Sequence, residues 1–164
     1  GVIAVEEDGK WSLLDVEGNL LIEESFDSII ADEKGITYRN ERLFVEKNGK
    51  FYLIDSTGQR IVEESFSDAK IFNGEGYAAV KVGTKWGFIN KDGKMIIEPM
   101  YEDARSFSNG YAAVKMNGKW GFINSQNDLK IEYQFTDAKD FNEGGCVLVK
   151  SDKWQMLHMY LFNF

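Results

Sequence analysis

One unit recurs along this chain, and each copy carries a lysine followed directly by an aromatic residue. The five pairs are Lys10-Trp11, Lys50-Phe51, Lys85-Trp86, Lys119-Trp120 and Lys153-Trp154. Their aromatic positions lie 40, 35, 34 and 34 residues apart (51−11, 86−51, 120−86 and 154−120). A fixed period of this length is typical of repeat architectures, in which one supersecondary unit cannot bury its apolar face alone and stacks on its neighbours. The period therefore constrains the architecture, whereas it says nothing of activity.

The composition describes a folded chain with a negative net charge. With 43% hydrophobic and 14% aromatic residues among 164, the chain can bury a sizeable core. Its 27 acidic and 19 basic residues give a net charge of −8, which repels phosphate backbones and anionic lipid headgroups, so we expect no nucleic acid partner. The longest apolar stretch, residues 156–164, is far too short to span a bilayer, and we expect no membrane insertion. The single cysteine, Cys146, cannot form an internal disulfide and leaves the compartment open, cytoplasmic or exported.

Short apolar runs separated by two-residue turns predict a β-hairpin in each unit. In the third unit residues 77–81 lead into residues 85–90, and in the fourth residues 111–115 lead into residues 119–124. The turns between such runs are Asp8-Gly9, Asn48-Gly49, Gly83-Thr84 and Asn117-Gly118. Asp-Gly and Asn-Gly suit type I′ turns, whose two central residues need positive φ, and a leading glycine suits the type II′ turn.

A two-residue turn also fixes which residues face each other across the hairpin. It places Lys115 across from Trp120 in the fourth unit and Glu46 across from Phe51 in the second. Because side chains alternate along a strand, one face of the fourth hairpin carries Ala113, Trp120 and Phe122, and the other carries Ala112, Val114, Gly121 and Ile123. Both faces are apolar, which predicts sheets covered on both sides by neighbouring units. The glycine after the tryptophan would let a neighbouring backbone or ring approach closely.

A second turn in each unit leads into a further short apolar strand that ends in glutamate. The expected strands are residues 20–23, 60–63, 94–98 and 129–132. Each unit then has three strands and a short fourth, and no stretch has the apolar spacing that a helix needs. The first unit has about five extra residues between Ile30 and Leu43, for which we expect a surface bulge or a hairpin extension.

The sequence resembles the WG-repeat family of bacterial proteins, also called KWG repeats. The resemblance rests on Lys85-Trp86-Gly87-Phe88-Ile89-Asn90, on the matching residues 119–124, and on the segments 92–94, 97–99 and 101–104. Trp11-Ser12, Phe51-Tyr52 and Trp154-Gln155 depart from the tryptophan-glycine pair. The resemblance implies an all-β repeat module without a defined enzymatic activity, and it supplies no catalytic residues.

We therefore expect one all-β domain, residues 1–164, in which tandem antiparallel hairpin or meander repeats form an elongated array. A β-propeller-like arrangement is the alternative, although propeller blades usually run somewhat longer than this period. The expected units are residues 2–42, 43–77, 78–111, 112–145 and a partial unit, 146–164. Exposed edge strands at the C-terminal end predict self-association.

No group of residues predicts catalysis, a metal ion or a cofactor. The acidic residues recur in successive units, whereas a catalytic pair is needed once, so we expect turn hydrogen bonds or pairing with Lys85, Lys119 and Lys153. The residues concerned are Glu63, Glu98, Glu132, Asp68, Asp103 and Asp137. His158 is the only histidine, which leaves too few ligands for a zinc site and no triad. It fills the position held by Asp15, Asp55, Asn90 and Asn124, so we expect it at a turn or strand end.

Two functions remain open. The first is a non-enzymatic scaffold for protein–protein interaction, because repeat arrays offer extended faces without a catalytic group. The alternative is a module that binds carbohydrate or cell-wall polysaccharide through exposed aromatic rings. For that alternative the candidate ligand-binding residues are Tyr77, Tyr111 and Tyr133, whereas the aromatic ring of each lysine-aromatic pair (Trp11, Phe51, Trp86, Trp120 and Trp154) is assigned to the repeat core.

Overall fold

The described part of the chain folds into five small antiparallel sheets that follow one another in sequence order. The computed structural model describes residues 1–31, 40–142 and 144–162. The strands are β1 (Ile3–Glu7) and β2 (Lys10–Leu14); β3 (Ser28–Ile29), β4 (Leu43–Lys47) and β5 (Lys50–Ile54); β6 (Asp68–Ala69), β7 (Tyr77–Val82), β8 (Lys85–Asn90) and β9 (Met95–Tyr101); β10 (Asp103–Ala104), β11 (Tyr111–Met116), β12 (Lys119–Asn124) and β13 (Leu129–Phe135); and β14 (Asp137–Ala138), β15 (Cys146–Lys150) and β16 (Trp154–His158). A 3₁₀-helix, η1 (Met159–Phe162), follows the last strand.

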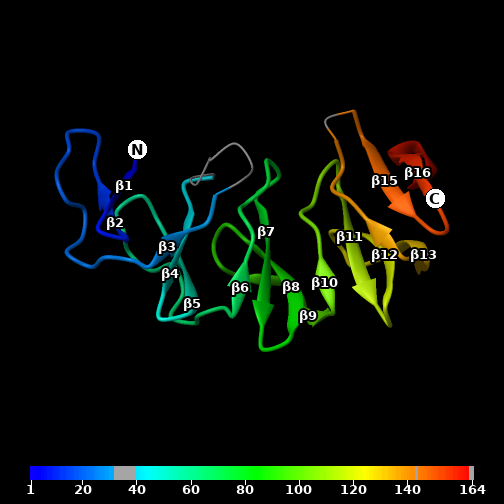
Figure 1. The fold of residues 1–164 in the computed structure, drawn as a ribbon, viewed down its shortest axis with the longest axis horizontal. Coiled ribbons are helices and arrows are strands. Elements are labelled where there is room, and N and C mark those ends of the chain that lie inside the picture. The colour runs from blue at the N-terminus through cyan, green and yellow to red at the C-terminus, as the bar shows by residue number, and fades with distance from the viewer. Residues whose placement is uncertain (32–39, 143, 163–164) are drawn as a thin grey trace.

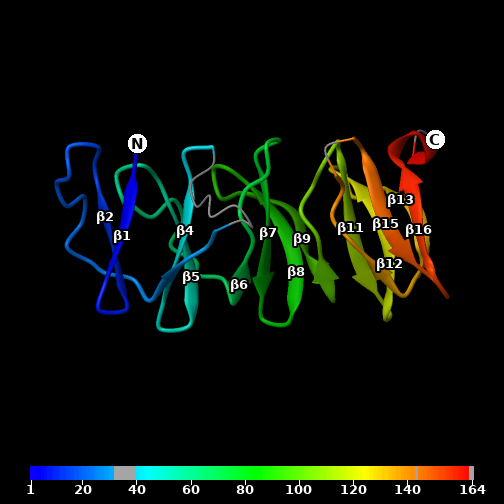
Figure 2. The ribbon, with the colours of Figure 1, turned by 45° about the horizontal axis from the view of Figure 1, so that its top comes forward.

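The sheets stand side by side along the long axis of the molecule, with the two termini toward its opposite ends (Figures 1 and 2). This all-β tandem array is the predicted fold class. The described residues contain no helix long and apolar enough to cross a membrane.

Each sheet is built on one hairpin, and we number the five hairpins from the N-terminus: β1–β2, β4–β5, β7–β8, β11–β12 and β15–β16. The predicted register is confirmed, since Lys115 pairs with Trp120 and Glu46 with Phe51. In the fourth hairpin both turn residues have positive φ, 50° at Asn117 and 74° at Gly118, as a type I′ turn requires. In the third turn only Gly83 has positive φ, 61°, which fits type II′.

Both faces of the inner hairpins are buried, as the sequence predicts. Three positions of each hairpin form what we call its forward face, which in the fourth hairpin is Ala113, Trp120 and Phe122. Three others form its backward face, which there is Ala112, Val114 and Ile123. The forward face of the fourth hairpin packs on Val147 and Val149 of the fifth. Its backward face packs on Trp86 and Phe88, which belong to the forward face of the third hairpin.

The fourth strand of a unit forms where a glycine follows the tryptophan. In the third sheet Trp86 pairs with Tyr101 and Phe88 with Ile97, so the ladder shifts between them and β9 bulges opposite Gly87. The first two units carry Ser12 and Tyr52 instead of this glycine. There the predicted strands at residues 20–23 and 60–63 are wrong, because only isolated bridges occur. In the first unit these bridges join Leu14 to Leu20 and Trp11 to Phe26. In the second unit they join Ile54 to Arg60 and Phe51 to Phe66. A side chain at the glycine position denies the close backbone approach that the bulged strand needs.

The second turn of each unit is held by one polar side chain at the end of the second hairpin strand. The Oδ1 atom of Asn124 accepts hydrogen bonds from the backbone N–H groups of Gln126, at 3.1 Å, and Asp128, at 2.8 Å. Asp15, Asp55 and Asn90 accept the equivalent bonds. His158 ends β16, and its Nδ1 atom accepts from the N–H of Tyr160 at 3.3 Å, which confirms the strand-end role expected for it. The extension expected between Ile30 and Leu43 falls mostly on residues 32–39, outside the described residues.

Candidate functional site

The two-residue strands β3, β6, β10 and β14 each open a sheet and lie beside the hairpin of that sheet. In three of them an aspartate precedes an alanine, and the Oδ1 atoms of Asp68, Asp103 and Asp137 each accept the N–H of the following alanine at 2.8 Å. The recurrent aspartates thus hold the backbone at the start of a sheet. This is a structural role of the kind that their recurrence predicts.

A basic residue follows each of these aspartate–alanine pairs, and in two of the three it joins one unit to the next. Lys70 Nζ donates a hydrogen bond to the carbonyl oxygen of Ala104, and Arg105 Nε donates to that of Ala138 at 3.2 Å. The same cations lie 3.9 Å from Asp103 and Asp137, respectively. Of the two roles expected for the aspartates, the structure shows backbone hydrogen bonds. The ion pairs of Asp103 and Asp137 are made with the basic residues Lys70 and Arg105 of the preceding unit and not with the lysines of the lysine-aromatic pairs.

Each of these cations also lies over the tryptophan of its own hairpin. The Lys70 ammonium is 5.0 Å from the Trp86 ring centroid, and the Arg105 guanidinium is 5.1 Å from that of Trp120. Cation–π contacts at such distances stabilise a desolvated cation. Burial lowers the pKa of the Lys70 ammonium, and the nearby Asp103 carboxylate opposes that shift. We call Lys70, Arg105 and Lys139 the basic row; Lys70 and Arg105 contact the next unit, whereas Lys139 contacts Asp137 and Trp154 of its own unit.

Polar contacts join successive units a few residues further along the chain. The Asn73 side-chain amide donates to the carbonyl oxygen of Phe107 at 2.6 Å. The Glu75 carboxylate accepts the backbone N–H of Gly110 at 3.1 Å. These bonds link positions 34 and 35 residues apart, so equivalent loops of neighbouring units are held at a fixed spacing.

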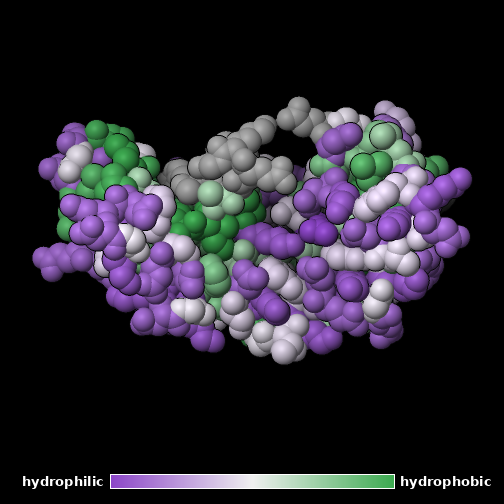
Figure 3. Space-filling model, in the orientation of Figure 1, coloured by the Kyte–Doolittle hydropathy of each residue, from purple (hydrophilic) through white to green (hydrophobic). Residues whose placement is uncertain are grey.

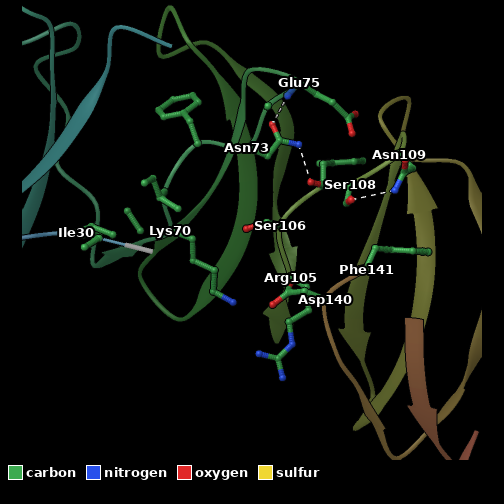
Figure 4. Close-up of a pocket in the computed structure, with 16 residues that line it drawn as sticks. Ile30, Lys70, Asn73, Glu75, Arg105, Ser106, Ser108, Asn109, Asp140 and Phe141 are labelled. Carbon is green, nitrogen blue, oxygen red and sulfur yellow. Dashed lines mark hydrogen bonds between the residues drawn. The ribbon is translucent and has the colours of Figure 1, made fainter. Parts of the chain in front are cut away.

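A groove of about 880 Å³ runs across these loops and is the candidate functional site. It is lined by residues 30–31, 69–75, 105–109 and 140–141, which are equivalent segments of four successive units. Figure 4 shows Lys70 and Arg105 extending from neighbouring units in the same direction, with Ser106 between the Asn73 and Phe141 sides of the groove. Phe72 and Phe107, both buried, form part of its floor.

One lining position of the groove differs in chemistry from unit to unit. In three of the four segments a residue of the basic row is followed two positions later by a phenylalanine, and between them stand Ile71, Ser106 and Asp140, an aliphatic, a hydroxyl and an acidic side chain. The first segment has Ile30 at the basic position and Ala31 at the intervening position. The repeated positions make contacts within and between units, whereas this intervening position presents a different group to the groove each time.

The three candidate tyrosines do not line this groove. Tyr77 packs on Phe107 with ring centroids 5.4 Å apart, and Tyr111 packs on Phe162 at 4.9 Å. Tyr133 packs against the cluster that contains Trp86 and Tyr101. All three are half-buried between hairpins. The described residues hold no group of three or more His, Cys, Asp or Glu side chains that could bind a metal ion.

The aromatic residues of the lysine-aromatic pairs differ in burial along the array. Trp86 and Trp120 are buried, Trp11 and Phe51 are half-buried, and Trp154 is exposed. The groove itself was missed in the sequence, although a signal for it exists. Lys70, Arg105 and Lys139 each follow an aspartate–alanine pair and lie 35 and 34 residues apart (105−70 and 139−105).

Comparison with known sequences identifies the family of this chain. The model of the WG containing repeat matches it three times, at residues 53–86, 86–120 and 120–154, which is more than half of its length. The chain belongs to the WG-repeat family. Each match runs from a hairpin's second strand to the corresponding strand of the next hairpin, so one WG repeat spans the interface between two sheets. No curated protein sequence matches the chain.

Among solved structures the WG repeats are similar in fold to Hsv2p and to a eukaryotic initiation factor. Hsv2p of Kluyveromyces lactis, a β-propeller, superposes with a TM-score of 0.58 at 13% identity, covering 99% of this chain and 59% of Hsv2p. A eukaryotic initiation factor superposes with a TM-score of 0.56 at 16% identity, covering 94% of this chain and 48% of that protein. At this identity the likeness concerns the fold alone, and it supports the propeller-like alternative for the arrangement of the sheets. The chain spans about three fifths of the length of Hsv2p.

Proposed function

We propose that this WG-repeat domain is a non-enzymatic scaffold that binds an extended segment of a partner protein in the groove across its inner loops. The observation that carries the proposal is the groove itself, about 880 Å³ and lined by equivalent segments of four successive units. An extended chain can contact all four segments at once. Repeat arrays commonly use such extended surfaces for binding.

The differing groove position favours a polypeptide over a polysaccharide. Ile71, Ser106 and Asp140 present an aliphatic, a hydroxyl and an acidic group at equivalent places. A polymer of identical sugars would meet different groups at equivalent positions, whereas a polypeptide can offer a matching side chain at each one. The tyrosines that a sugar site would use as platforms pack between hairpins instead. This supports protein as the partner class.

The side chains at the differing groove position also indicate which residues a partner segment would carry. An apolar side chain suits the place beside Ile71, and a basic side chain suits the place beside Asp140. Lys70 and Arg105 already donate hydrogen bonds to backbone carbonyl oxygens of the next unit. They therefore form the walls of the groove and contribute little to the choice of partner.

The experiment is a selection of peptides from a random display library on the wild-type domain, followed by fluorescence polarisation with the enriched peptides. The Ser106→Trp variant places a large ring in the middle of the groove. We expect it to weaken binding at least about tenfold, which corresponds to ~1.4 kcal/mol. Thr84→Trp, in the exposed turn of the third hairpin, adds the same ring outside the groove and should leave binding unchanged.

Circular dichroism would check that both variants remain folded. A selection that yields no binder, or binders that tolerate Ser106→Trp as well as they tolerate Thr84→Trp, would contradict the proposal. Competition of an enriched peptide by soluble cell-wall glycan would instead favour the carbohydrate alternative.

A further inference from the structure

The four apolar cores formed by the described residues all join the forward face of one hairpin to the backward face of the next. In the first core Leu13 and Trp11 meet Val45 and Ile54. In the second, Phe44 and Leu53 meet Val80 and Ile89. The third and fourth repeat the arrangement with the residues described above. One type of contact between two unlike faces is thus used four times within the chain.

This pattern leaves one forward face and one backward face unmatched among the described residues. The forward face of the fifth hairpin consists of Leu148, Trp154 and Met156, which are 43%, 43% and 64% exposed. At the same positions of the fourth hairpin Ala113, Trp120 and Phe122 are 1%, 3% and 0% exposed. The exposure of the fifth hairpin therefore reflects that none of the described residues packs on this face, and it does not come from the residue types.

The backward face of the first hairpin is the other unmatched face. Ile3 and Val5 are 43% and 37% exposed, whereas their equivalents in the fourth hairpin, Ala112 and Val114, are fully buried. Figure 3 shows hydrophobic surface at both ends of the long axis. The 3₁₀-helix η1 does not cover the forward face of the fifth hairpin, because its buried residue, Phe162, packs on Phe122 in the fourth core.

We propose that the forward face of the fifth hairpin binds the backward face of the first hairpin in a second copy of this chain. The contact continues the interface that already joins consecutive hairpins, with Leu148, Trp154 and Met156 on one side and Ile3 and Val5 on the other. It is a head-to-tail contact between unlike surfaces, so its repetition builds rings or open filaments and no symmetric dimer. It uses none of the groove residues and is independent of the proposed function.

The charges at the rims of the two faces are complementary. The turn of the first hairpin carries Glu6, Glu7 and Asp8 against one basic residue, Lys10, and the turn of the fifth carries Lys150 and Lys153 against one acidic residue, Asp152. Consecutive hairpins place their turns on the same side of the array (Figure 2), so stacking brings these two turns together. Opposite charges at a rim speed association and set its register, and salt weakens them.

The experiment is analytical ultracentrifugation of the 164-residue chain over a range of concentrations, with one variant for each face. Met156→Asp places a charge on the forward face and Val5→Asp places one on the backward face. Both residues are exposed, so both variants should fold, and circular dichroism checks this. Thr84→Asp adds the same charge to the exposed turn of the third hairpin as a matched control.

We expect the wild type and Thr84→Asp to associate with increasing concentration, and each face variant alone to be monomeric. An equimolar mixture of the two face variants should form a one-to-one dimer and nothing larger, because the mixture contains one intact forward face and one intact backward face. A wild type that stays monomeric at about 1 mM overturns the proposal. So does a mixture that forms no dimer, or association that survives in either variant alone.

Discussion

The carbonyl oxygen of Ile131 lies 2.7 Å from the point where a Cβ atom on residue 121 would stand, and residue 121 is glycine. The same relationship holds in the preceding repeat, where the carbonyl oxygen of Ile97 lies 2.5 Å from the corresponding point at Gly87. The glycine of the tryptophan–glycine pair therefore admits the backbone of the fourth strand of its own sheet. The two units that lack it have only isolated bridges in that place.

Gly121→Ala should destabilise the domain by about 1–3 kcal/mol, because the added methyl group meets backbone atoms that cannot move without breaking the ladder of β12 and β13. Urea unfolding followed by circular dichroism measures the change. Gly74→Ala is the matched control, since nothing lies within 4 Å of its Cβ position and its φ is not positive. Equal stabilities of the two variants would argue against the close approach as the reason for the glycine.

Trp120→Ala and Trp154→Ala remove the same side chain from equivalent positions with different surroundings. Trp120 is 3% exposed and lies in the fourth core, so its loss should cost about 3–5 kcal/mol. Trp154 is 43% exposed, and its loss should cost less than half as much in the monomer. Thermal and urea unfolding at low protein concentration compare the two. If Trp120→Ala leaves the melting temperature unchanged, the ring is no part of the core.

The turn sequences carried most of the information about this fold. Asn117-Gly118 specifies a two-residue turn, which sets the register and hence the two apolar faces of the hairpin, and both were predicted correctly. Strands were wrongly predicted at residues 20–23 and 60–63, because their absence depends on the side chain of Ser12 or Tyr52 across the sheet. An apolar run alone does not contain that information.

The groove could not be predicted for a similar reason. Its walls depend on contacts such as that of Lys70 with Ala104, in which a side chain bonds to a backbone atom of the next unit. A repeat period indicates that neighbouring units touch, but it does not show which side-chain and backbone atoms of two units meet. The recurrence of a basic residue after Asp68-Ala69 and Asp103-Ala104 is visible in the sequence and was the available signal.

Lys70→Met tests whether the basic row joins the units. Methionine is apolar and unbranched, but it removes the ammonium that lies over Trp86 and bonds the carbonyl oxygen of Ala104, so we expect a loss of about 1–2 kcal/mol in the free energy of unfolding. Lys94→Met, at an exposed position, is the control and should change stability by less than about 0.5 kcal/mol. Hydrogen exchange should show the excess opening near β10. Identical exchange in the two variants would count against a joining role.

Tyr101→Phe should change how stability depends on pH. The Tyr101 ring is buried, and its hydroxyl lies 2.5 Å from Asn127 Oδ1. Burial raises the pKa of the Tyr101 hydroxyl above its ordinary value near 10, and the neighbouring Tyr133 raises it further. The folded state therefore holds this proton at pH values where the unfolded chain releases it. The stability that the neutral hydroxyl provides is complete below pH 10 and is lost as the pH rises above it.

At neutral pH the wild type should exceed Tyr101→Phe by about 1 kcal/mol, the typical value of one hydrogen bond. Above pH 10 this difference should shrink, because phenylalanine has no proton to release. Urea unfolding between pH 7 and about pH 11 measures both curves, and Tyr160→Phe, at an exposed ring, controls for loss of a hydroxyl. Curves that stay parallel across this range would mean that Tyr101 ionises equally in the folded and unfolded chains, against the burial seen between β9 and β13.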